Sequence, residues 1–580
     1  MIFFRRKRNV NKKHSRKKII DHEIAPDEIF LDASNLPKFN RAQFEGRFEK
    51  SISHSTFVGL FVFVGVLFLI LLLRAGYLQV VRGNVFAQES AHNSLEAKTL
   101  FAPRGIITDE HGVVLAENRR RSDGSVRRYY TLPAIGQIIG YVSSPKKDSH
   151  GRYYDTAEVG LAGLEAKYNQ LLIGKNGKIL TERDALGNIR SQGIVVPVKE
   201  GAPLVLTIDA SLERDFAKAV ANVAKREHFV AGAGVIMDVR TGAVRAIVSY
   251  PSYNPNVMVN GGPASDIASY NTDEGHPFLD HAVQGVYTPG STVKPFVASG
   301  ALTDGIITKD TVIDDKGRLL IPNPYHPGKN YVYNGWRALG PVNVEKAIAW
   351  SSDIFFYTVG GGFKNMKGLG IDRLDYWYRQ FGLGERTGID LPNEASGVIP
   401  SPAWKEKVFG APWYLGDTYF TAIGQYGMQV TPIQMARATA AVANGGTLVT
   451  PYLHEGDTTA KTQVPVDLKK LSIVRKGMRM GVTSALAGAL NFPYVAIAAK
   501  TGTAQVGVHN EYDNAWVEGF FPYDNPRYSF AVVLERGPSG AGEQAVNVMH
   551  DLFEMLHREN SVYVGGTGKV IVATSTVSKR

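Results

Sequence analysis

A long apolar run near the start of the chain restricts the folds available to it. Residues 57–73 read FVGLFVFVGVLFLILLL and contain no charged or strongly polar side chain. Extended back to Ser51, the uncharged segment ends just before Arg74. A helix of that length crosses a hydrocarbon core of about 30 Å. A cleaved signal peptide has a shorter apolar region and no such long leader, so residues 51–74 are predicted to be an uncleaved transmembrane anchor.

The positive charge of the chain lies mainly in front of this anchor. The formal net charge is +11, and residues 1–20 hold nine Lys or Arg and no acid, which leaves only +2 for the rest of the chain. The positive-inside rule then places a basic tail, residues 1–50, in the cytoplasm and everything after Arg74 outside the cytoplasmic membrane. Because anionic lipid headgroups attract such a tail, its charge indicates a membrane partner and no nucleic acid.

The first part of the chain beyond the anchor has no recognisable catalytic cluster. Residues 75–200 are predicted to form a β-rich, non-catalytic pedestal, or dimerisation-like, domain. Helical spacing of Leu, Val and Phe over 75–100 predicts that the anchor helix continues there as a stalk. A hairpin is expected at 106–115 and a helical run at 161–172.

Residues 201–560 have the pattern of one α+β domain, followed by a flexible tail at 561–580. A long helix and a hairpin with an Arg-Thr-Gly turn at 240–242 stand near its start, and a helix at 543–558 closes it. Further apolar runs typical of strands lie at 204–209, 494–505, 514–523 and 527–536. Early and late strands separated by a largely helical middle predict an antiparallel sheet with helices on both faces.

The first of three short motifs in this domain is Ser-Thr-Val-Lys at 291–294. Ser-x-x-Lys also occurs at Ser15, Ser143 and Ser144, but only the Ser291 copy follows Pro-Gly and opens an apolar helical run. Free backbone N–H groups at a helix N-terminus can stabilise a developing oxyanion beside such a serine. Because three residues along a helix return to the same face, the Lys294 amine is expected beside the Ser291 hydroxyl.

Each of the other two motifs is weaker evidence for a catalytic site when it is taken alone. Ser-Ser-Asp at 351–353 is also typical of an ordinary helix cap. Lys-Thr-Gly-Thr at 500–503 follows the apolar run VAIAA. A cationic, hydroxyl-rich edge strand suits a substrate carboxylate, and Gly502 would let a ligand approach the backbone closely. The absence of cysteine excludes disulfides, zinc fingers, iron–sulfur clusters and a cysteine nucleophile, which leaves serine as the candidate nucleophile.

Together and in this order, the motifs resemble those of penicillin-binding proteins and serine β-lactamases, Ser-x-x-Lys, Ser-x-Asn and Lys-Thr-Gly. FLDHAVQGVYTPGSTVKPF, GDTYFTAIGQYGMQVTPIQMARATAAVANGG and AKTGTAQ look like the transpeptidase domain of class B penicillin-binding proteins. PRGIITDEHGVVLAEN and GLAGLEAKYNQLLIGKNGK look like the pedestal of the same group, so the resemblance covers residues 55–558. Asp353, where division-type members tend to carry Asn, resembles the elongation-type branch called penicillin-binding protein 2.

The resemblance implies a monofunctional peptidoglycan D,D-transpeptidase, a covalent target of β-lactams. Ser291 would attack a D-alanyl-D-alanine stem peptide, and an amine of a neighbouring peptide would resolve the acyl-enzyme. Lys294 must be neutral to take the serine proton, which burial and the nearby Lys500 would favour. Ser351 would relay a proton to the leaving amine. Asp353 would orient Ser351 and the lysines, although an acid so close should raise the pKa of Lys294.

The resemblance also implies how substrate is held. Lys500, Thr501, Gly502 and Thr503 would bind the terminal carboxylate, and the backbone N–H groups of Ser291 and Thr503 would form the oxyanion hole. No cofactor is expected. No metal is expected either, because His326 is the single histidine in 310–350, the region where some relatives carry a metal site. No glycosyltransferase domain is visible, so a separate SEDS-type polymerase and other elongation-complex proteins are the expected partners.

Two alternatives remain from the sequence. The first is hydrolysis, as a D,D-carboxypeptidase or β-lactamase. A fast β-lactamase needs a base that activates water, and the candidate Glu394 lacks the neighbours expected of such a base. The second is a membrane-anchored β-lactam sensor or inactive scaffold, which the short cytoplasmic tail disfavours.

Overall fold

The computed structural model describes residues 53–87, 95–122, 125–149, 153–183, 188–454, 460–541 and 544–567. The chain divides into two compact units, 1–94 and 95–580. The predicted basic tail at 1–50 and residues 568–580 of the predicted C-terminal tail lie outside the described residues. The described start of that C-terminal tail is packed on the domain, because Tyr563 and Val564 are buried and Tyr563 Oη donates to Asp209 Oδ2 at 3.2 Å.

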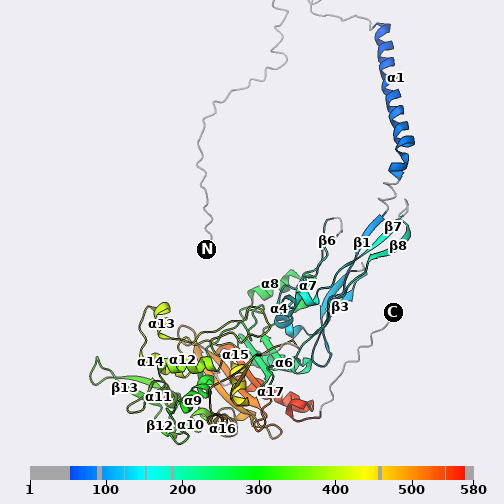
Figure 1. Ribbon diagram of the computed structural model, residues 1–580. Helices are drawn as coiled ribbons and strands as arrows, with labels where there is room; N and C mark the ends of the chain where they lie inside the picture. Colours follow the sequence, from blue (N-terminus) through cyan, green and yellow to red (C-terminus); the bar gives the residue numbers. More distant parts are fainter. Residues whose placement is uncertain are drawn as a thin grey trace, which may run out of the picture. The chain divides into compact units, whose positions relative to one another are not determined.

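The first unit is dominated by one apolar helix, α1, His54–Gly76 (Figure 1). None of its residues is buried, although most of them are apolar. A π-helical turn, Tyr77–Val81, extends it, and the whole segment His54–Val81 has the length and hydropathy of a membrane-spanning helix. The apolar run thus forms the candidate span that its composition predicts.

The second unit begins with a strand where a helical stalk was expected. β1 (Leu95–Leu100) pairs with β7 (Gly177–Arg183), which pairs with β8 (Ile189–Val196), and both pairings are antiparallel. The prediction of a helical stalk is therefore wrong for residues 95–100. Six residues of β1 are in register with β7, and this long-range pairing overrides the local helical spacing.

A second small sheet has the strand order β4-β3-β2-β9. The predicted hairpin is confirmed by β2 (Ile107–Thr108) and β3 (Val114–Arg120), which β4 (Val126–Tyr130) extends. The strand expected at 204–209 is only β9, Leu204–Val205, because Asp209 instead caps the helix α6 (Ala210–Arg226). The helix expected at 161–172 is divided into α4 (Gly163–Lys167) and α5 (Asn169–Leu172).

A buried ion-pair network ties these elements together. The Glu165 carboxylate accepts hydrogen bonds from Arg104 Nε at 2.5 Å and Arg128 Nε at 2.6 Å. Tyr130, at the end of β4, also exchanges hydrogen bonds with the Asn256 side chain, 126 residues further along the chain. Such long-range contacts anchor the small sheets on the larger domain that follows.

The predicted antiparallel sheet is confirmed. Its strand order is β11-β10-β20-β19-β18, so β18 is an edge strand. All neighbouring pairs are antiparallel. The strands are β10 (Ala231–Asp238), β11 (Val244–Tyr250), β18 (Ala498–Val506), β19 (Tyr512–Phe521) and β20 (Tyr528–Pro538).

Helices cover both faces of this sheet, as predicted. On one face, α6 and α17 (Ala545–Arg558) form a core with the sheet that includes Phe216 and Phe553. On the other face, α15 (Pro432–Asn444) contacts β10, β19 and β20. The helical middle also contains α7 (Pro255–Asn260), α8 (Ala264–Thr272), α9 (Lys294–Thr303), α10 (Val344–Ala349), α11 (Asp353–Gly361), α12 (Gly370–Gln380), α13 (Pro402–Phe409), α14 (Leu415–Ala422) and α16 (Leu468–Ser484).

The second unit also contains short elements. They include α3 (Gly136–Ile139), β5 (Lys146–Lys147), β6 (Tyr153–Asp155), β12 (Ile313–Asp315), β13 (Arg318–Pro322), β14 (Asn330–Asn334), β15 (Gly340–Val342), β16 (Thr447–Val449), β17 (Lys461–Gln463) and the 3-10 turns Pro133–Ile135, Gly488–Leu490 and Val562–Val564. The hairpin of β13 and β14 interrupts the middle that was expected to be largely helical, and exposed His326 lies in its turn.

A buried acid in α6 makes the stability of this domain depend on pH. Glu213 is fully buried, and its carboxylate accepts a hydrogen bond from Ile247 N of β11 at 2.7 Å. Burial raises the pKa of Glu213 from 4.5 to about 8. Because the folded state holds this proton more tightly, the stabilising contribution is complete below the unfolded pKa and is lost as pH rises through about 8.

Replacing Glu213 with Gln should therefore flatten the pH dependence of stability. The amide stays uncharged and keeps the acceptor for Ile247 N. We expect the fall in Tm between roughly pH 5 and pH 8 to be smaller in Glu213→Gln than in the wild type. The same replacement at exposed Glu406 is the control. A pH slope in Glu213→Gln equal to that of the wild type would contradict the assignment.

Candidate active site

Ser291 lies where the sequence predicts, in a turn at the start of a helix. The 3-10 turn Gly290–Val293 leads directly into α9, and Pro295 occupies the first turn of α9, where its missing N–H is tolerated. Gly290 has φ +56°, and a Cβ atom there would lie 2.6 Å from Thr503 O. Glycine therefore allows the turn that carries Ser291 to pack directly against β18.

Gly502 makes the same contact from the side of the strand. A Cβ atom at Gly502 would lie 2.8 Å from both Pro289 O and Thr292 Cγ2. The missing side chain is therefore needed for packing between β18 and the turn, a reason different from the expected approach of a ligand. A contact between Gly502 and substrate stays a prediction.

Lys294 is fully buried under this turn. Its Nζ donates to Ser351 O at 2.9 Å, Ser351 Oγ at 3.1 Å and Asp353 Oδ1 at 2.7 Å. Among the described residues no hydrogen bond joins Lys294 Nζ to Ser291 Oγ, so the expected contact between them is not formed here. Burial lowers the pKa of Lys294, although Asp353 and the more distant Asp315 act in the opposite direction. The sequence alone did not show whether burial or Asp353 has the larger effect on the pKa of Lys294. In the structure the effect of burial is the larger.

Ser351 lies between two lysines. Its Oγ accepts hydrogen bonds from Lys294 Nζ and, at 3.0 Å, from Lys500 Nζ. A hydroxyl has two acceptor sites and one proton, so these two bonds leave the Ser351 proton available for donation. The backbone of Ser351 has φ +57°, a conformation that costs a non-glycine residue about 1–3 kcal/mol and is often found at functional sites.

The second motif does contain a helix cap, as its alternative interpretation predicts, and the capping residue is Ser352. Ser352 is the N-cap of α11, accepts a hydrogen bond from Phe355 N and donates to Asp315 Oδ2 at 2.5 Å. This leaves Ser351 and Asp353 free to serve the site. Asp353 also accepts a hydrogen bond from Trp336 N at 3.3 Å, from the loop that follows β14.

Glu518, behind the third motif, was not predicted. It is the cross-strand partner of Lys500, is fully buried, and accepts a hydrogen bond from Thr439 Oγ1 of α15 at 2.5 Å. Burial raises the pKa of Glu518 to about 8, while Thr439 and Lys500 act in the opposite direction. The only sequence signal was an acid within the apolar run NAWVEGFF, at a position that alternation places on the same face as Trp516.

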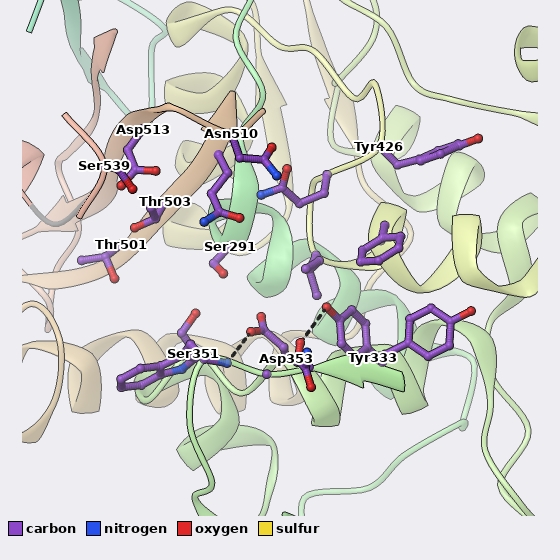
Figure 2. A pocket seen from close by; sticks show the side chains of 18 of the residues that line it. Ser291, Tyr333, Ser351, Asp353, Tyr426, Thr501, Thr503, Asn510, Asp513 and Ser539 are labelled. Atoms are coloured by element: carbon purple, nitrogen blue, oxygen red, sulfur yellow. Dashed lines mark hydrogen bonds between the residues drawn. The ribbon is translucent and has the colours of Figure 1, made fainter. Parts of the chain in front are cut away.

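These groups surround a cavity of about 850 Å³. Figure 2 shows Ser291 near its centre, with Thr501 and Thr503 on one side and Ser351 and Asp353 on another. The sequence did not predict the aromatic residues that line the cavity, which are Tyr333, Trp336, Tyr357, Phe420 and Tyr426. They come from segments far apart in the chain, and no local spacing marks them.

One group of side chains in the described part of the chain has the spacing of metal ligands. Ligand atoms of Glu110, His111 and Asp209 lie within 4.8 Å of one another. None of these residues lines the cavity. Glu110 pairs with Arg245, and Asp209 accepts the N-terminal N–H groups of α6, so both carboxylates have structural partners.

The arrangement has the parts of a serine acyl-transfer site. A serine hydroxyl stands at a helix N-terminus, a buried lysine of lowered pKa follows three residues later, and a second hydroxyl links that lysine to Lys500. A neutral amine can accept a proton from an attacking hydroxyl, and backbone N–H groups can stabilise the resulting oxyanion.

Two family models match this chain. The penicillin binding protein transpeptidase domain matches residues 232–554, and the penicillin-binding protein dimerisation domain matches residues 120–206. The peptidoglycan D,D-transpeptidase MrdA of Escherichia coli strain K12 is 34% identical over 474 residues, which cover 74% of this chain and 71% of that protein.

Solved structures agree with these matches. A chain described under "Structural coordination of polymerization and crosslinking by a peptidoglycan synthase complex" has a TM-score of 0.69 and 28% identity, covering 90% of this chain and 100% of that one. The complex between penicillin-binding protein PBP2 and MreC from Helicobacter pylori contains a chain with a TM-score of 0.66 and 26% identity to this one. The match covers 80% of this chain and 99% of that one.

Replacing Asp353 with Asn tests the electrostatic description of Lys294. Since Asp353 raises the pKa of Lys294, its removal should lower that pKa further. If Lys294 is the base for acylation, we expect the acid limb of the rate at which a reactive β-lactam acylates the protein to move to lower pH in Asp353→Asn. An acid limb that stays in place or moves to higher pH would contradict this description.

Proposed function

The chain belongs to the penicillin-binding transpeptidase family and is a peptidoglycan D,D-transpeptidase of the elongation type, and we propose that Ser291 is the nucleophile through which it acts. The observation that carries this proposal is the junction of the three motifs. Lys294 and Lys500 both donate to Ser351 Oγ at the edge of a cavity that Ser291 lines.

Acylation begins with proton transfer from Ser291 to Lys294. The lowered pKa favours loss of a proton from Lys294, and the neutral amine then gives up one of the three hydrogen bonds it donates here and turns its lone pair to Ser291. The hydrogen bond to Ser291 forms when substrate is bound, because such contacts often tighten only in the complex. Ser291 Oγ bonds to the carbonyl carbon of the penultimate D-alanine, and the bond to the terminal D-alanine nitrogen breaks. Ser351 passes a proton to that leaving amine, and Lys294 supplies the proton to Ser351.

Substrate is held along the edge of the sheet. The free edge of β18 can pair with an extended peptide, as in other cases of strand addition. Thr501, Thr503 and Lys500 bind the terminal carboxylate, and the backbone N–H groups of Ser291 and Thr503 stabilise the oxyanion. With the carboxylate near Thr501, the peptide runs antiparallel to β18, and its N-terminal part lies towards Gln505.

An amine of a second stem peptide completes the reaction. Its nitrogen attacks the acyl carbonyl, the bond to Ser291 Oγ breaks, and a new peptide bond cross-links the two stem peptides. The proton that the attacking amine loses returns through Lys294 to Ser291 Oγ, which restores the free enzyme. Hydrolysis is not favoured, because the 34% identical relative MrdA is named a peptidoglycan D,D-transpeptidase. Glu394 accepts hydrogen bonds from Thr387 N, Thr387 Oγ1 and Gly388 N, which occupy its carboxylate in a structural role.

We also propose the topology and the domain organisation. Residues 51–74 anchor the chain in the cytoplasmic membrane, with the tail 1–50 inside and the catalytic domain outside, as the basic composition of residues 1–20 supports. The pedestal is assigned to 75–200 and the transpeptidase domain to 201–560. The likeness to chains from a synthase complex and from a complex with MreC supports partnership with a SEDS-type polymerase and elongation-complex proteins.

Labelling with fluorescent penicillin tests the nucleophile. We expect the full-length protein in detergent to form a stable adduct and Ser291→Ala to form none, because Ser291 is the one serine of the described cavity lining that begins a Ser-x-x-Lys motif. Ser299→Ala, which removes a buried hydroxyl of the same helix, is the control and should label normally. Labelling retained in Ser291→Ala would refute the assignment.

A second assay separates the transpeptidase from the carboxypeptidase. Supplied with lipid-linked glycan and a polymerase, the wild type should produce cross-linked dimers of stem peptides. Release of D-alanine without cross-links, under conditions where the penicillin adduct forms, would favour the carboxypeptidase.

A further inference from the structure

One buried carboxylate in the wall of the cavity has no role in the chemistry described above. Asp513, in β19, is only 3% exposed and lines the same cavity as Ser291. Its Oδ2 accepts a hydrogen bond from Gly540 N at 2.7 Å, in the turn between β20 and α17. Its Oδ1 is buried and has no hydrogen-bond partner among the described residues. Figure 2 shows Asp513 with Ser539 on the wall that also carries Thr503.

The charge of Asp513 is also not neutralised by a cation. None of the ion pairs formed by the described residues includes Asp513. A buried, unpaired carboxylate oxygen is unfavourable, and in native proteins such a group usually has a partner. A carboxylate can only accept hydrogen bonds, so the missing partner is a donor, and a cationic donor compensates the charge best.

A bulge in the sheet sets the position of Asp513. The register between β19 and β20 shifts after Asp513, and Arg536 on β20 adopts φ +51° at this point. The Asn514 side chain stabilises the irregular backbone by accepting a hydrogen bond from Arg536 N at 2.9 Å. Bulges of this kind often re-aim a side chain beside a functional site.

The register places Asp513 beyond the reacting carbonyl. Asp513 is the cross-strand partner of Gln505, two residues along β18 from Thr503, which corresponds to about 7 Å. A peptide paired with the edge of β18 lies roughly two strand spacings, about 10 Å, from the backbone of Asp513. Only a long side chain on the N-terminal part of the substrate can bridge this distance and meet the Asp513 carboxylate.

The cross-linking reaction itself supplies such a side chain. The acceptor is an amine on a neighbouring stem peptide, and donor and acceptor belong to the same polymer. Each donor peptide therefore carries the same amino group, which is not consumed when that peptide is the donor. At neutral pH this group is an ammonium ion on a flexible stem.

We propose that Asp513 binds the side-chain ammonium group of the donor stem peptide, on the residue that precedes the two D-alanines. The inference rests on the proposed function, since it uses the orientation of the peptide along β18. Asp513 acts in recognition and does not take part in bond formation. The site thereby selects donor peptides whose side-chain amine is still free over those in which it is already acylated by a cross-link.

Two soluble peptides and two variants test this inference. The peptides end in L-Lys-D-Ala-D-Ala and differ only in a free or an acetylated lysine ε-amine. The measurement is kcat/KM for D-alanine release by the full-length protein in detergent, with a separate small amine supplied in saturating amount as the acceptor, so that both peptides are compared as donors only. Asp513→Asn keeps the acceptor for Gly540 N and removes the charge. Glu511→Gln is the matched control, because it removes an exposed charge two residues away that does not line the cavity.

We expect the wild type and Glu511→Gln to prefer the free amine by roughly tenfold or more, the size of one hydrogen bond to a charged group. Asp513→Asn should lose this preference, and its residual rate should be the same for both peptides. A wild type that does not distinguish the peptides, or an Asp513→Asn variant that still does, would overturn the inference. Failure of the proposed function has a different result, namely no D-alanine release from either peptide and no penicillin adduct on Ser291.

Discussion

The proposed active site depends on one hydroxyl that accepts hydrogen bonds from two buried lysines. Ser351 Oγ contacts Lys294 from α9 and Lys500 from β18, so it joins three segments that are far apart in the sequence. Two ammonium ions this close, both largely removed from water, would repel one another strongly. Burial lowers the pKa of Lys294, and Asp353 balances part of the remaining charge.

The rest of the domain holds these groups together. β18 is an edge strand of the five-stranded sheet. The close packing of Gly290 and Gly502 holds the turn that carries Ser291 against β18. Ser352 caps α11 and binds buried Asp315, which fixes the chain on either side of Ser351 and Asp353. Glu518 lies behind Lys500 and is held by Thr439 of α15. Helices and sheet therefore determine the positions of the charges that the chemistry uses.

Much of this arrangement could be predicted from local patterns. The apolar run forms the helix α1, the alternating apolar segments form the antiparallel sheet, and Ser291 stands at the start of α9. The features that were missed depend on long-range contacts. β1 was expected to be helical, because pairing with β7 cannot be seen in its own residues. Glu518 and the aromatic wall likewise acquire their places only when separate segments fold together, and Gly502 is explained by a neighbour more than two hundred residues earlier in the chain.

The central claim is that Lys294 is the base that activates Ser291, and that burial lowers the pKa of its amine for this role. The pH dependence of wild-type acylation tests this claim most directly, through the rate of reaction of Ser291 with a chromogenic cephalosporin. The account predicts an acid limb below 10.5, the ordinary pKa of lysine, followed by a plateau. A rate that rises through that value, as for an ordinary solvent-exposed lysine, would contradict it.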